Sequence, residues 1–400
     1  MIVVQIGGFL TGAQKTIELG IHDYLCKNNH KSYVFYEYGH STDFNVYCYE
    51  TKIENILTRG LRKVIGKYPI FTRLQTKRLV QKLRMIKPDI IHLHILHDGC
   101  VDYCYLLKYI AKSHIPVVYT MHDLWALTGG CYHYTQSKCI GYLNQCVDCM
   151  GQETKMDCKK KRAQKEYLMK KKLLLSISKY ASVGVSYWVK GEIMKSYLSR
   201  RPVYVIHNCI DDFQNDILQK YVVPLRKTRY RLIGVSQTWD ETKGINEMFE
   251  LARGLGTDYE VLLVGKINKQ YFDSEVPDNV SFYGYCEDKY QLYCLLAEAD
   301  VNISMSVEET FGMTFVEAAA VGTRSIGYAS TGIDEVLKMT YGISVSKQNI
   351  DFMIKEVKRL VLEDKMKLSS EQIARIKQYF SIERMAKEYC EVYNSINVYP

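Results

Sequence analysis

Short apolar segments alternate with amphipathic segments along almost the whole 400-residue chain, and this alternation limits the fold more than any other feature of the sequence. Apolar runs between turn signals predict buried strands, and apolar residues spaced by 3.6 predict helices. The strands predicted in the first half are MIVVQI (1–6), YVFYEY (33–38), IIHLHIL (90–96), VVYTM (117–121), SVGVS (182–186) and VYVIHN (203–208). Buried strands that alternate with helices indicate an α/β fold, in which a parallel sheet is covered on both faces.

The second half repeats the scheme. Its predicted strands are RLIGVS (231–236), EVLLVG (260–265), VSFYGY (280–285), DVNISMS (300–306) and RSIGYA (324–329). Because 400 residues exceed one ordinary core, we expect two Rossmann-like, doubly wound domains, residues 1–210 and 211–380, joined near the polar stretch 208–230. We expect them to face each other across a cleft that binds ligands. An apolar helical pattern at 382–393 predicts that residues 381–400 form a helix that crosses back to the first domain.

The bulk composition excludes several classes of protein. Hydrophobic residues make up 47% and charged residues 24%, which are values of globular proteins. The sequence contains no uncharged apolar run of about 18 residues that would predict a membrane-spanning helix. The N-terminus lacks the basic flank and cleavage site of a signal peptide, so we expect a cytoplasmic protein. The net charge of +9 favours anionic partners without choosing among nucleotides, anionic lipids and nucleic acids.

The segment ETFGMTFVE, from Glu309 to Glu317, lies where a predicted strand gives way to a helix. Gly312 lets the backbone approach a ligand closely, and N–H groups at the start of the helix can hold a phosphate. The two carboxylates can both face one ligand and accept hydrogen bonds from sugar or ribose hydroxyls. From composition alone, an amphipathic helix with a solvated glutamate would be the commoner explanation.

The arrangement of these two glutamates around Thr-Phe-Gly resembles the hallmark motif of glycosyltransferase family 4, which are retaining enzymes with the GT-B fold. Further segments match the family in order over nearly the whole chain: PDIIHLH (88–94), TMHD (120–123), VIHNCID (205–211), KG (243–244), AD (299–300) and GYASTGIDE (327–335). Ordered matches at this scale are more specific than any one motif. The resemblance implies that the first domain faces the acceptor and that the second binds a nucleotide-sugar donor, a UDP- or GDP-sugar.

The resemblance also implies roles for single residues of the donor domain. Glu317 would bind the donor ribose, Glu309 would lie beside the transferred sugar, and Lys243 would neutralise the diphosphate. Many members carry arginine where this chain has Gln237, so neutralisation would depend on Lys243, aided by Arg324 or by helix N-termini.

Two more residues are implied by the resemblance, in the first domain. His122 ends a predicted strand and would contact the donor sugar. Gly12, in the glycine turn 7–13, would reach the donor phosphates and the acceptor. The expected catalytic residues are therefore His122, Glu309 and Lys243. The expected donor-binding residues are Gly12, Gln237, Lys243, Thr310, Phe311, Gly312 and Glu317. Enzymes of this kind generally need no divalent metal, so no catalytic cofactor is expected.

Four of the thirteen cysteines lie close together in the sequence, at Cys131, Cys139, Cys146 and Cys149. The C-x2-C pair suggests a structural zinc site within an insertion at about 129–158, although a zinc ribbon would have two such pairs. Four free thiols in a compact loop are the alternative. A similar insertion follows the segment HDxWxxTGxC in a bacterial polysaccharide branch of the family, and HDLWALTGGC (122–131) resembles it. That branch implies capsule, exopolysaccharide or O-antigen synthesis on a lipid-linked acceptor.

Residues 158–180 combine many lysines with an apolar tail. Such a stretch could hold the enzyme against the anionic inner face of the cell membrane, although a solvated basic helix is the commoner meaning of a charge run. Two other functions stay open. The first is a catalytically inactive relative that binds nucleotide sugars, suggested by Gln237. The second is a zinc-containing nucleic-acid-binding protein, which no recognisable motif supports, so we expect no nucleic-acid partner. A nicotinamide dehydrogenase would need a complete glycine fingerprint, and the turn 7–13 lacks it.

Overall fold

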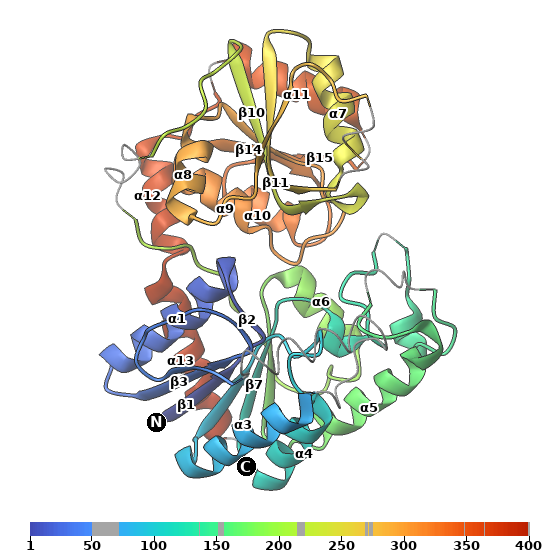
Figure 1. The fold of residues 1–400 in the computed structure, drawn as a ribbon, viewed down its shortest axis with the longest axis vertical. Coiled ribbons are helices and arrows are strands. Elements are labelled where there is room, and N and C mark those ends of the chain that lie inside the picture. The colour runs from blue at the N-terminus through green and yellow to red at the C-terminus, as the bar shows by residue number, and fades with distance from the viewer. Residues whose placement is uncertain are drawn as a thin grey trace. The chain divides into compact units, whose positions relative to one another are not determined.

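The computed structural model describes residues 1–49, 72–135, 137–150, 156–213, 221–268, 271, 275–347, 349–363 and 365–398. The chain divides into two compact units, Met1–Cys209 with Ile382–Pro400 and Ile210–Ser381. Each unit contains one large parallel sheet with helices on its faces (Figure 1). Part of the stretch at which we expected the domains to join, residues 214–220, lies outside the described residues.

The first unit is built on a seven-stranded sheet in the order β5-β3-β1-β6-β7-β8-β9, with all neighbours parallel. The strands are β1 (Ile2–Ile6), β3 (Lys31–Tyr36), β5 (Val46–Cys48), β6 (Ile90–Leu93), β7 (Val117–Met121), β8 (Tyr180–Gly184) and β9 (Val203–Val205). Two short strands, β2 (Phe9–Leu10) and β4 (Tyr38–Gly39), pair separately. The chain runs outward from β1 to one edge and returns through β6, so the strand order reverses between β1 and β6. Ligands of such sheets bind at the carboxyl strand ends beside this reversal.

Two rows of helices cover this sheet (Figure 1). On one face lie α1 (Gly12–Lys27) and α13 (Ile382–Val398), and on the other lie α3 (Arg73–Ile86), α4 (Tyr103–Ser113) and α5 (Ala163–Leu175), followed by α6 (Tyr187–Lys195). The C-terminal helix α13 is part of this unit's core, because its Met385 and Tyr389 pack in one apolar cluster with Ile17 and Ile21 of α1. The Tyr393 hydroxyl also lies 2.7 Å from His92 Nδ1 of β6.

The second unit is built on a six-stranded parallel sheet in the order β12-β11-β10-β13-β14-β15. The strands are β10 (Tyr230–Trp239), β11 (Tyr259–Ile267), β12 (Val280–Gly284), β13 (Val301–Ser304), β14 (Arg324–Tyr328) and β15 (Ile343–Val345). The helices α7 (Ile245–Leu255) and α11 (Ile350–Leu362) pack together on one face, and α8 (Lys289–Glu298), α9 (Met313–Ala320), α10 (Ile333–Met339) and α12 (Ser370–Tyr379) gather on the other. The strand order reverses between β10 and β13. Among the described helices of the whole chain, none is long and apolar enough to cross a membrane.

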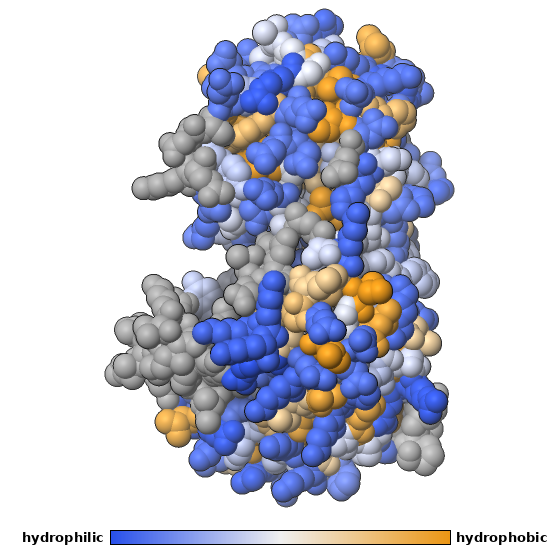
Figure 2. All heavy atoms as spheres, turned by 90° about the vertical axis from the view of Figure 1, so that its right-hand side faces the viewer, coloured by the Kyte–Doolittle hydropathy of each residue, from blue (hydrophilic) through white to orange (hydrophobic). Residues whose placement is uncertain are grey.

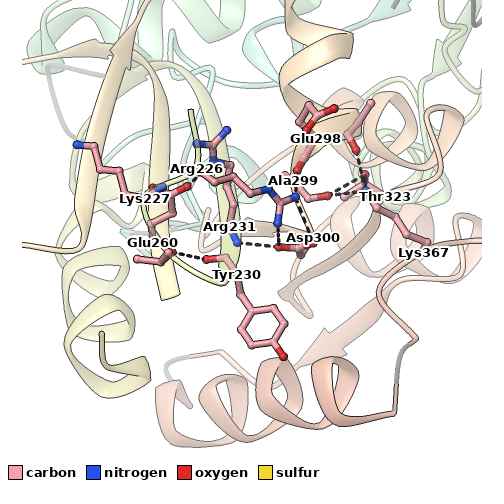
Figure 3. Close-up of polar contacts among 12 residues, drawn as sticks. Arg226, Lys227, Tyr230, Arg231, Glu260, Glu298, Ala299, Asp300, Thr323 and Lys367 are labelled. Carbon is pink, nitrogen blue, oxygen red and sulfur yellow. Dashed lines mark hydrogen bonds and ion pairs between the residues drawn. The ribbon is translucent and has the colours of Figure 1, made fainter. Parts of the chain in front are cut away.

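A buried ion pair joins the amino ends of β10 and β11 (Figure 3). Arg231 Nε lies 2.6 Å from Glu260 Oε1, and only 2% and 4% of the two side chains are exposed. The other guanidinium nitrogens donate to the carbonyls of Pro224 and Leu225, at 2.9 Å each. The arginine therefore satisfies its hydrogen bonds while it ties the segment before β10 to the sheet.

A second carboxylate continues this network at the amino end of β13 (Figure 3). Asp300 Oδ2 accepts from the backbone N–H of Arg231 at 2.7 Å and from Arg226 Nη1 at 2.8 Å. Nearby, Lys367 Nζ donates to Thr323 Oγ1 at 2.9 Å and to the Ala299 carbonyl. Burial lowers the pKa of Lys367 to about 8. These charges hold three strand ends together at the edge of the sheet opposite to the carboxyl ends.

We expect the substitution Arg231→Met to lower the free energy of unfolding of this unit by about 3 kcal/mol or more, because it leaves Glu260 buried without its cation. Urea unfolding followed by hydrogen-exchange mass spectrometry of β10 and β11 measures this loss. Arg375→Met is the matched control, because Arg375 and its partner Glu371 are largely exposed, and it should leave the midpoint unchanged. A loss below about 1 kcal/mol for Arg231→Met would show that the network contributes little.

Candidate active site

The segment Glu309–Glu317 leads from β13 into α9, at the carboxyl edge of the second sheet. Gly312 precedes the first residue of α9 with a φ of +97°, a left-handed conformation that favours glycine. A Cβ at Gly312 would lie 2.7 Å from the Phe315 ring, which is a second reason for glycine at this position. Because glycine has no side chain to cap the helix, the first amides of α9 can point toward an anionic ligand.

Lys243 lies beside this segment, in the turn that follows β10. Its Nζ forms an ion pair with Glu309 Oε1, and Ser306 Oγ donates to the same oxygen at 3.0 Å. The turn lies close to the chain that follows β13: a Cβ at Gly244, whose φ is +74°, would lie 2.5 Å from Met305 Cβ, and the Val307 N–H donates to the Thr242 carbonyl at 3.2 Å. The Lys243 and Glu309 side chains are 25% and 29% exposed, so a ligand can reach both. The structure thus brings together two of the predicted catalytic residues.

The backbone of Glu309 is fixed by the loop before α10. Thr331 Oγ1 accepts from the Glu309 N–H at 3.0 Å and donates to the Glu309 carbonyl at 2.7 Å. The Gly332 N–H donates to the same carbonyl at 3.0 Å. A Cβ at Gly332 would lie 2.2 Å from the Thr310 oxygen, so the two loops are in close contact. The segment 327–335 therefore fixes the backbone of the motif at Glu309 and Thr310.

Glu317 lies on the second turn of α9 and is 4% exposed. Burial and Asp211 raise the pKa of this carboxyl, while the ammonium of Lys289, 3.6 Å from Glu317 Oε1, lowers it, and the net shift is upward. Lys289 Nζ also lies 2.6 Å from Asp211 Oδ2, to which Tyr293 donates at 3.4 Å. Sequence reasoning gave no role to Lys289 or Asp211. The signals were the matched segment 205–211 for Asp211 and, for Lys289, a helix start just after the carboxyl end of β12.

Three other predicted donor-site positions have different surroundings. Gln237 is exposed and lies where the pairing of β10 with β11 shifts register, between Val235 and Thr238. The Phe311 side chain is 2% exposed and packs 6.1 Å from the Phe380 ring, so only its backbone can face a ligand. Arg324 is the first residue of β14, at the amino edge of the sheet, and donates to the Tyr341 carbonyl. Arg324 therefore does not assist Lys243 in this structure.

In the first unit, the predicted residues Gly12 and His122 lie after the carboxyl ends of β1 and β7, the two strands that flank β6 in the sheet. Gly12 begins α1 with a φ of +54° and is exposed. His122 follows β7, and its Nε2 lies 3.0 Å from His94 Nδ1, while His94 Nε2 lies 3.2 Å from Gln5 Oε1. Since the Gln5 amide nitrogen donates to the Glu18 carbonyl, its oxygen accepts from His94. His94 Nδ1 must then accept from His122 Nε2, which leaves His122 Nδ1 as an acceptor.

The two histidines of this relay are neutral, whereas a third histidine nearby is charged. Burial lowers the pKa of His122 to about 4 and that of His94 well below its ordinary value. Burial alone would also lower the pKa of His97, but the carboxylates of Asp123 and Asp98 raise it to about 10. His97 Nε2 lies 2.6 Å from Asp123 Oδ2, and His97 Nδ1 lies 3.0 Å from Asp98 Oδ2. This charged clamp joins the loop after β6 to the loop after β7.

The cysteine insertion, residues 129–158, lies beside the clamp, and residues 136 and 151–155 of it lie outside the described residues. Two tyrosines, Tyr134 and Tyr142, donate to Glu192 Oε2 of α6, the second at 2.6 Å. Cys146 Sγ accepts from the Gly129 N–H at 3.2 Å, and Cys158 Sγ donates to the Gly129 carbonyl at 3.2 Å. The tyrosines fix the described part of the insertion on α6, and the two thiols link its parts to one another at Gly129.

The thiols of the insertion lie near one another without forming a ligand set. Burial raises the pKa of Cys131 to about 12, and the neighbouring thiols of Cys149, Cys139, Cys146 and Cys158 add to the shift. Sequence reasoning did not include Cys158 in this cluster. Across the described ranges, no three His, Cys, Asp or Glu side chains are arranged to hold a metal ion.

Zinc binding stays a prediction that elemental analysis of purified protein can test. A structural site requires the sulfurs to converge at about 2.3 Å from one ion. If Cys131, Cys139, Cys146 and Cys149 turn toward a shared ion, about one zinc per chain is expected. The absence of zinc, with freely titrating thiols, would leave the insertion held by its tyrosine and backbone contacts alone.

We expect the pKa values of His97 and His122 to be shifted in opposite directions, so that the two histidines affect stability over different ranges of pH. Because the folded pKa of His97, about 10, lies above its ordinary value of 6.5, its stabilising effect is complete below pH 6.5 and is lost as the pH rises through 10. His122, with a folded pKa of about 4, favours unfolding as the pH falls from 6.5 toward 4. Nitrogen NMR should show a doubly protonated His97 and a neutral His122 at pH 8. A His97 midpoint near 6.5 would contradict the clamp, and His97→Gln identifies its signal.

Comparisons with known proteins agree with this architecture. Residues 19–212 match the family described as Glycosyltransferase Family 4, and residues 220–378 match that described as Glycosyl transferases group 1. WcaC of Escherichia coli K12, a protein assigned to colanic acid biosynthesis as a glycosyl transferase, is 23% identical over 325 residues, which are 78% of each chain.

Solved structures share the fold over the whole chain. A glycosyltransferase from Rickettsia africae aligns with 100% of this chain and 99% of its own, at a TM-score of 0.64 and 16% identity. HepE from Anabaena, in complex with UDP, aligns over 98% and 99%, at a TM-score of 0.66 and 15% identity. The predicted GT-B fold is confirmed, and the chain belongs to glycosyltransferase family 4.

Proposed function

We propose that the protein is a retaining glycosyltransferase that moves a sugar from a UDP- or GDP-sugar to a saccharide acceptor. The observation that carries the proposal is the partly exposed ion pair of Lys243 and Glu309. It lies beside the segment that leads into α9, a helix whose first residue has no side-chain cap. A diphosphate at this position would exchange one anionic partner of Lys243 for another and would meet the amides of the helix. The UDP held by the HepE structure supports a nucleotide as the ligand.

Glu317 and Lys289 complete the donor side. The Glu317 carboxylate would accept hydrogen bonds from the two ribose hydroxyls, and this requires its ionised form. Because burial favours the neutral acid, the nearby ammonium of Lys289 is the group that favours the anion. Lys289 is thus a positioning residue, and Glu317 is the residue that touches the donor.

The proposed reaction breaks the bond between the anomeric carbon and the phosphate oxygen and forms a bond from the acceptor oxygen to the same face of that carbon. The acceptor proton passes to the leaving phosphate oxygen. Lys243 and the amides of Thr310, Phe311 and Gly312 would stabilise the negative charge that grows on the diphosphate. Glu309 would lie beside the transferred sugar, and Gln237 would contact the phosphates as a neutral donor. Since these groups supply positive charge, we propose no metal requirement.

The first unit would supply the remaining contacts. His122 Nδ1, the acceptor nitrogen of the His122 ring in the His94–His122 relay, would accept from a hydroxyl of the donor sugar. The exposed turn at Gly12 would approach the phosphates and the acceptor. The assignment of WcaC to colanic acid biosynthesis supports a bacterial capsule, exopolysaccharide or O-antigen saccharide as the acceptor, carried on a lipid. The enzyme would then act in the cytoplasm, where nucleotide sugars are made. An inactive relative that only binds nucleotide sugars would have the same site. Measured sugar transfer distinguishes an active transferase from such a relative.

We expect Lys243→Ala to lower the turnover number by about 10²- to 10³-fold, because it removes a charge that acts on the growing negative charge of the diphosphate. Glu317→Ala should mainly weaken nucleotide binding, since its contacts are made in the ground state and the transition state alike. Transfer and hydrolysis assays with a panel of UDP- and GDP-sugars, together with thermal shifts by UDP and GDP, measure both effects.

Lys338→Ala serves as the control, because Lys338 is 71% exposed and forms its ion pair with Asp334, one turn away on the same helix. It should behave as the parent protein. Unchanged kinetics in both site variants would rule out this site. Nucleotide binding without any turnover of the parent protein across the panel would favour the inactive relative.

A further inference from the structure

The cysteine insertion exposes an unusual group of apolar side chains. Ile140, Leu143, Val147 and Met150, which we call the apolar tip, are 69%, 51%, 48% and 63% exposed. Single exposed apolar residues are common on protein surfaces and need no explanation. Four large ones within eleven residues of one loop form a patch of the kind that marks an interaction surface.

The apolar side chains are exposed although the backbone of the loop is ordered by hydrogen bonds. Backbone bonds close successive turns, from Leu143 to Ile140 at 3.0 Å, from Cys146 to Gly141 at 2.7 Å and from Val147 to Asn144 at 3.2 Å. The inward positions between them are occupied by buried Tyr142, which bonds to Glu192 of α6, and by buried Cys146, which bonds to Gly129. The apolar tip therefore faces away from the unit while its neighbours are anchored in it.

Basic residues flank the apolar tip at the start of α5. The insertion meets α5 closely, since a Cβ at Gly129 would lie 2.5 Å from the Ala163 carbonyl. The exposed lysines there are Lys159, Lys160 and Lys161, just before α5, and Lys165 in its first turn. Glu166, the carboxylate on this turn of the helix, is paired with Arg162 at 2.6 Å, and Asp148 is an exposed acid of the loop itself. The local balance is strongly positive, and Figure 2 shows apolar surface next to hydrophilic surface on this side of the unit.

Most of the apolar tail of the basic stretch 158–180 does not take part in this surface. Leu173, Leu174 and Ile177 are at most 5% exposed, because they pack in the core of the unit. The helix thus offers charge to a partner, and the insertion offers apolar side chains. Such a surface suits an anionic lipid interface, because the apolar side chains can contact the acyl chains and the flanking lysines can pair with the anionic headgroups.

We propose that the apolar tip and the lysines around the start of α5 dock this unit on an anionic lipid surface. The proposal rests on the proposed function, because a lipid-linked acceptor would be presented at such a surface. The apolar side chains enter the boundary between headgroups and acyl chains, and the lysines pair with lipid phosphates. The docked insertion is the same element that lies beside His97 and Asp123, next to His122.

Flotation of the full chain with vesicles tests the proposal without donor or acceptor. Phosphatidylcholine vesicles that contain phosphatidylglycerol should bind the protein, and pure phosphatidylcholine vesicles should bind it at least tenfold less. The double substitution Leu143→Ser and Val147→Ser should lower binding about tenfold or more at any salt concentration. The triple substitution Lys159→Gln, Lys160→Gln and Lys161→Gln should also lower binding, and should remove most of its dependence on salt.

Leu362→Ser and Lys365→Gln are the matched controls, because these exposed residues belong to the second unit and not to the insertion. They should bind vesicles as the parent protein does, and circular dichroism confirms that every variant is folded. Equal vesicle binding by the tip variant and the parent would overturn the proposal. A second outcome would also overturn it: the parent does not bind vesicles and is a dimer in light scattering, whereas the tip variant is a monomer. The apolar tip would then contact a second copy of the chain. Transfer assays with a water-soluble acceptor report separately on the proposed function.

Discussion

Parallel strand pairing places every carboxyl strand end of a sheet at the same edge, and the candidate site depends on this constraint in both units. In the second unit, the Lys243 turn follows β10, Lys289 follows β12 and the Glu309 loop follows β13. In the first unit, the glycine turn follows β1, and His94 and His122 follow β6 and β7. Residues more than sixty positions apart, such as Lys243 and Glu309, become neighbours for this reason alone. Each site lies where the strand order reverses, because the connections there diverge to opposite faces and leave the edge open.

The two edges of the second sheet use charge in different ways. At the amino edge, Arg231 and Glu260 are almost completely buried, and the arginine fills its remaining bonds with backbone carbonyls. Such a pair is costly to break and has no capacity left for a ligand. At the carboxyl edge, Lys243 and Glu309 are each about a quarter exposed and pair with each other through a single contact. An exposed pair contributes little to stability, so a diphosphate can replace one partner at small cost. The same chemistry of opposite charges is therefore structural at one edge and available for binding at the other.

The sequence allowed the fold to be predicted because strand and helix patterns are local properties. The strands expected at 231–236, 260–265 and 324–329 are found as β10, β11 and β14, each within a few residues, and the GT-B fold is confirmed. The short strands β5 and β15 were not predicted, because they carry too few residues to show a period. Contacts between distant segments were missed. Neither the Lys289–Asp211 pair nor the clamp of His97 by Asp98 and Asp123 follows from spacing, because only the sheet brings these residues together. Nor does spacing show that the Cys146 and Cys158 thiols form hydrogen bonds with the backbone of Gly129.

The cysteine insertion shows how a segment without a core of its own can keep a fixed shape. Ordering each of its residues costs about 1–2 kcal/mol of backbone entropy, and neither a helix longer than one turn nor a ladder of strands in its described part offsets that cost. The stabilising contacts are instead single polar anchors: two tyrosine hydroxyls on Glu192, a thiol on Gly129, and Tyr132 stacked at 5.4 Å on the charged ring of His97. Because aromatic and polar side chains occupy the inward positions, the aliphatic residues of the loop have no interior to enter. Their exposure is thus a consequence of how the insertion is anchored, and the anchors that expose them also tie the loop to the clamp beside His122.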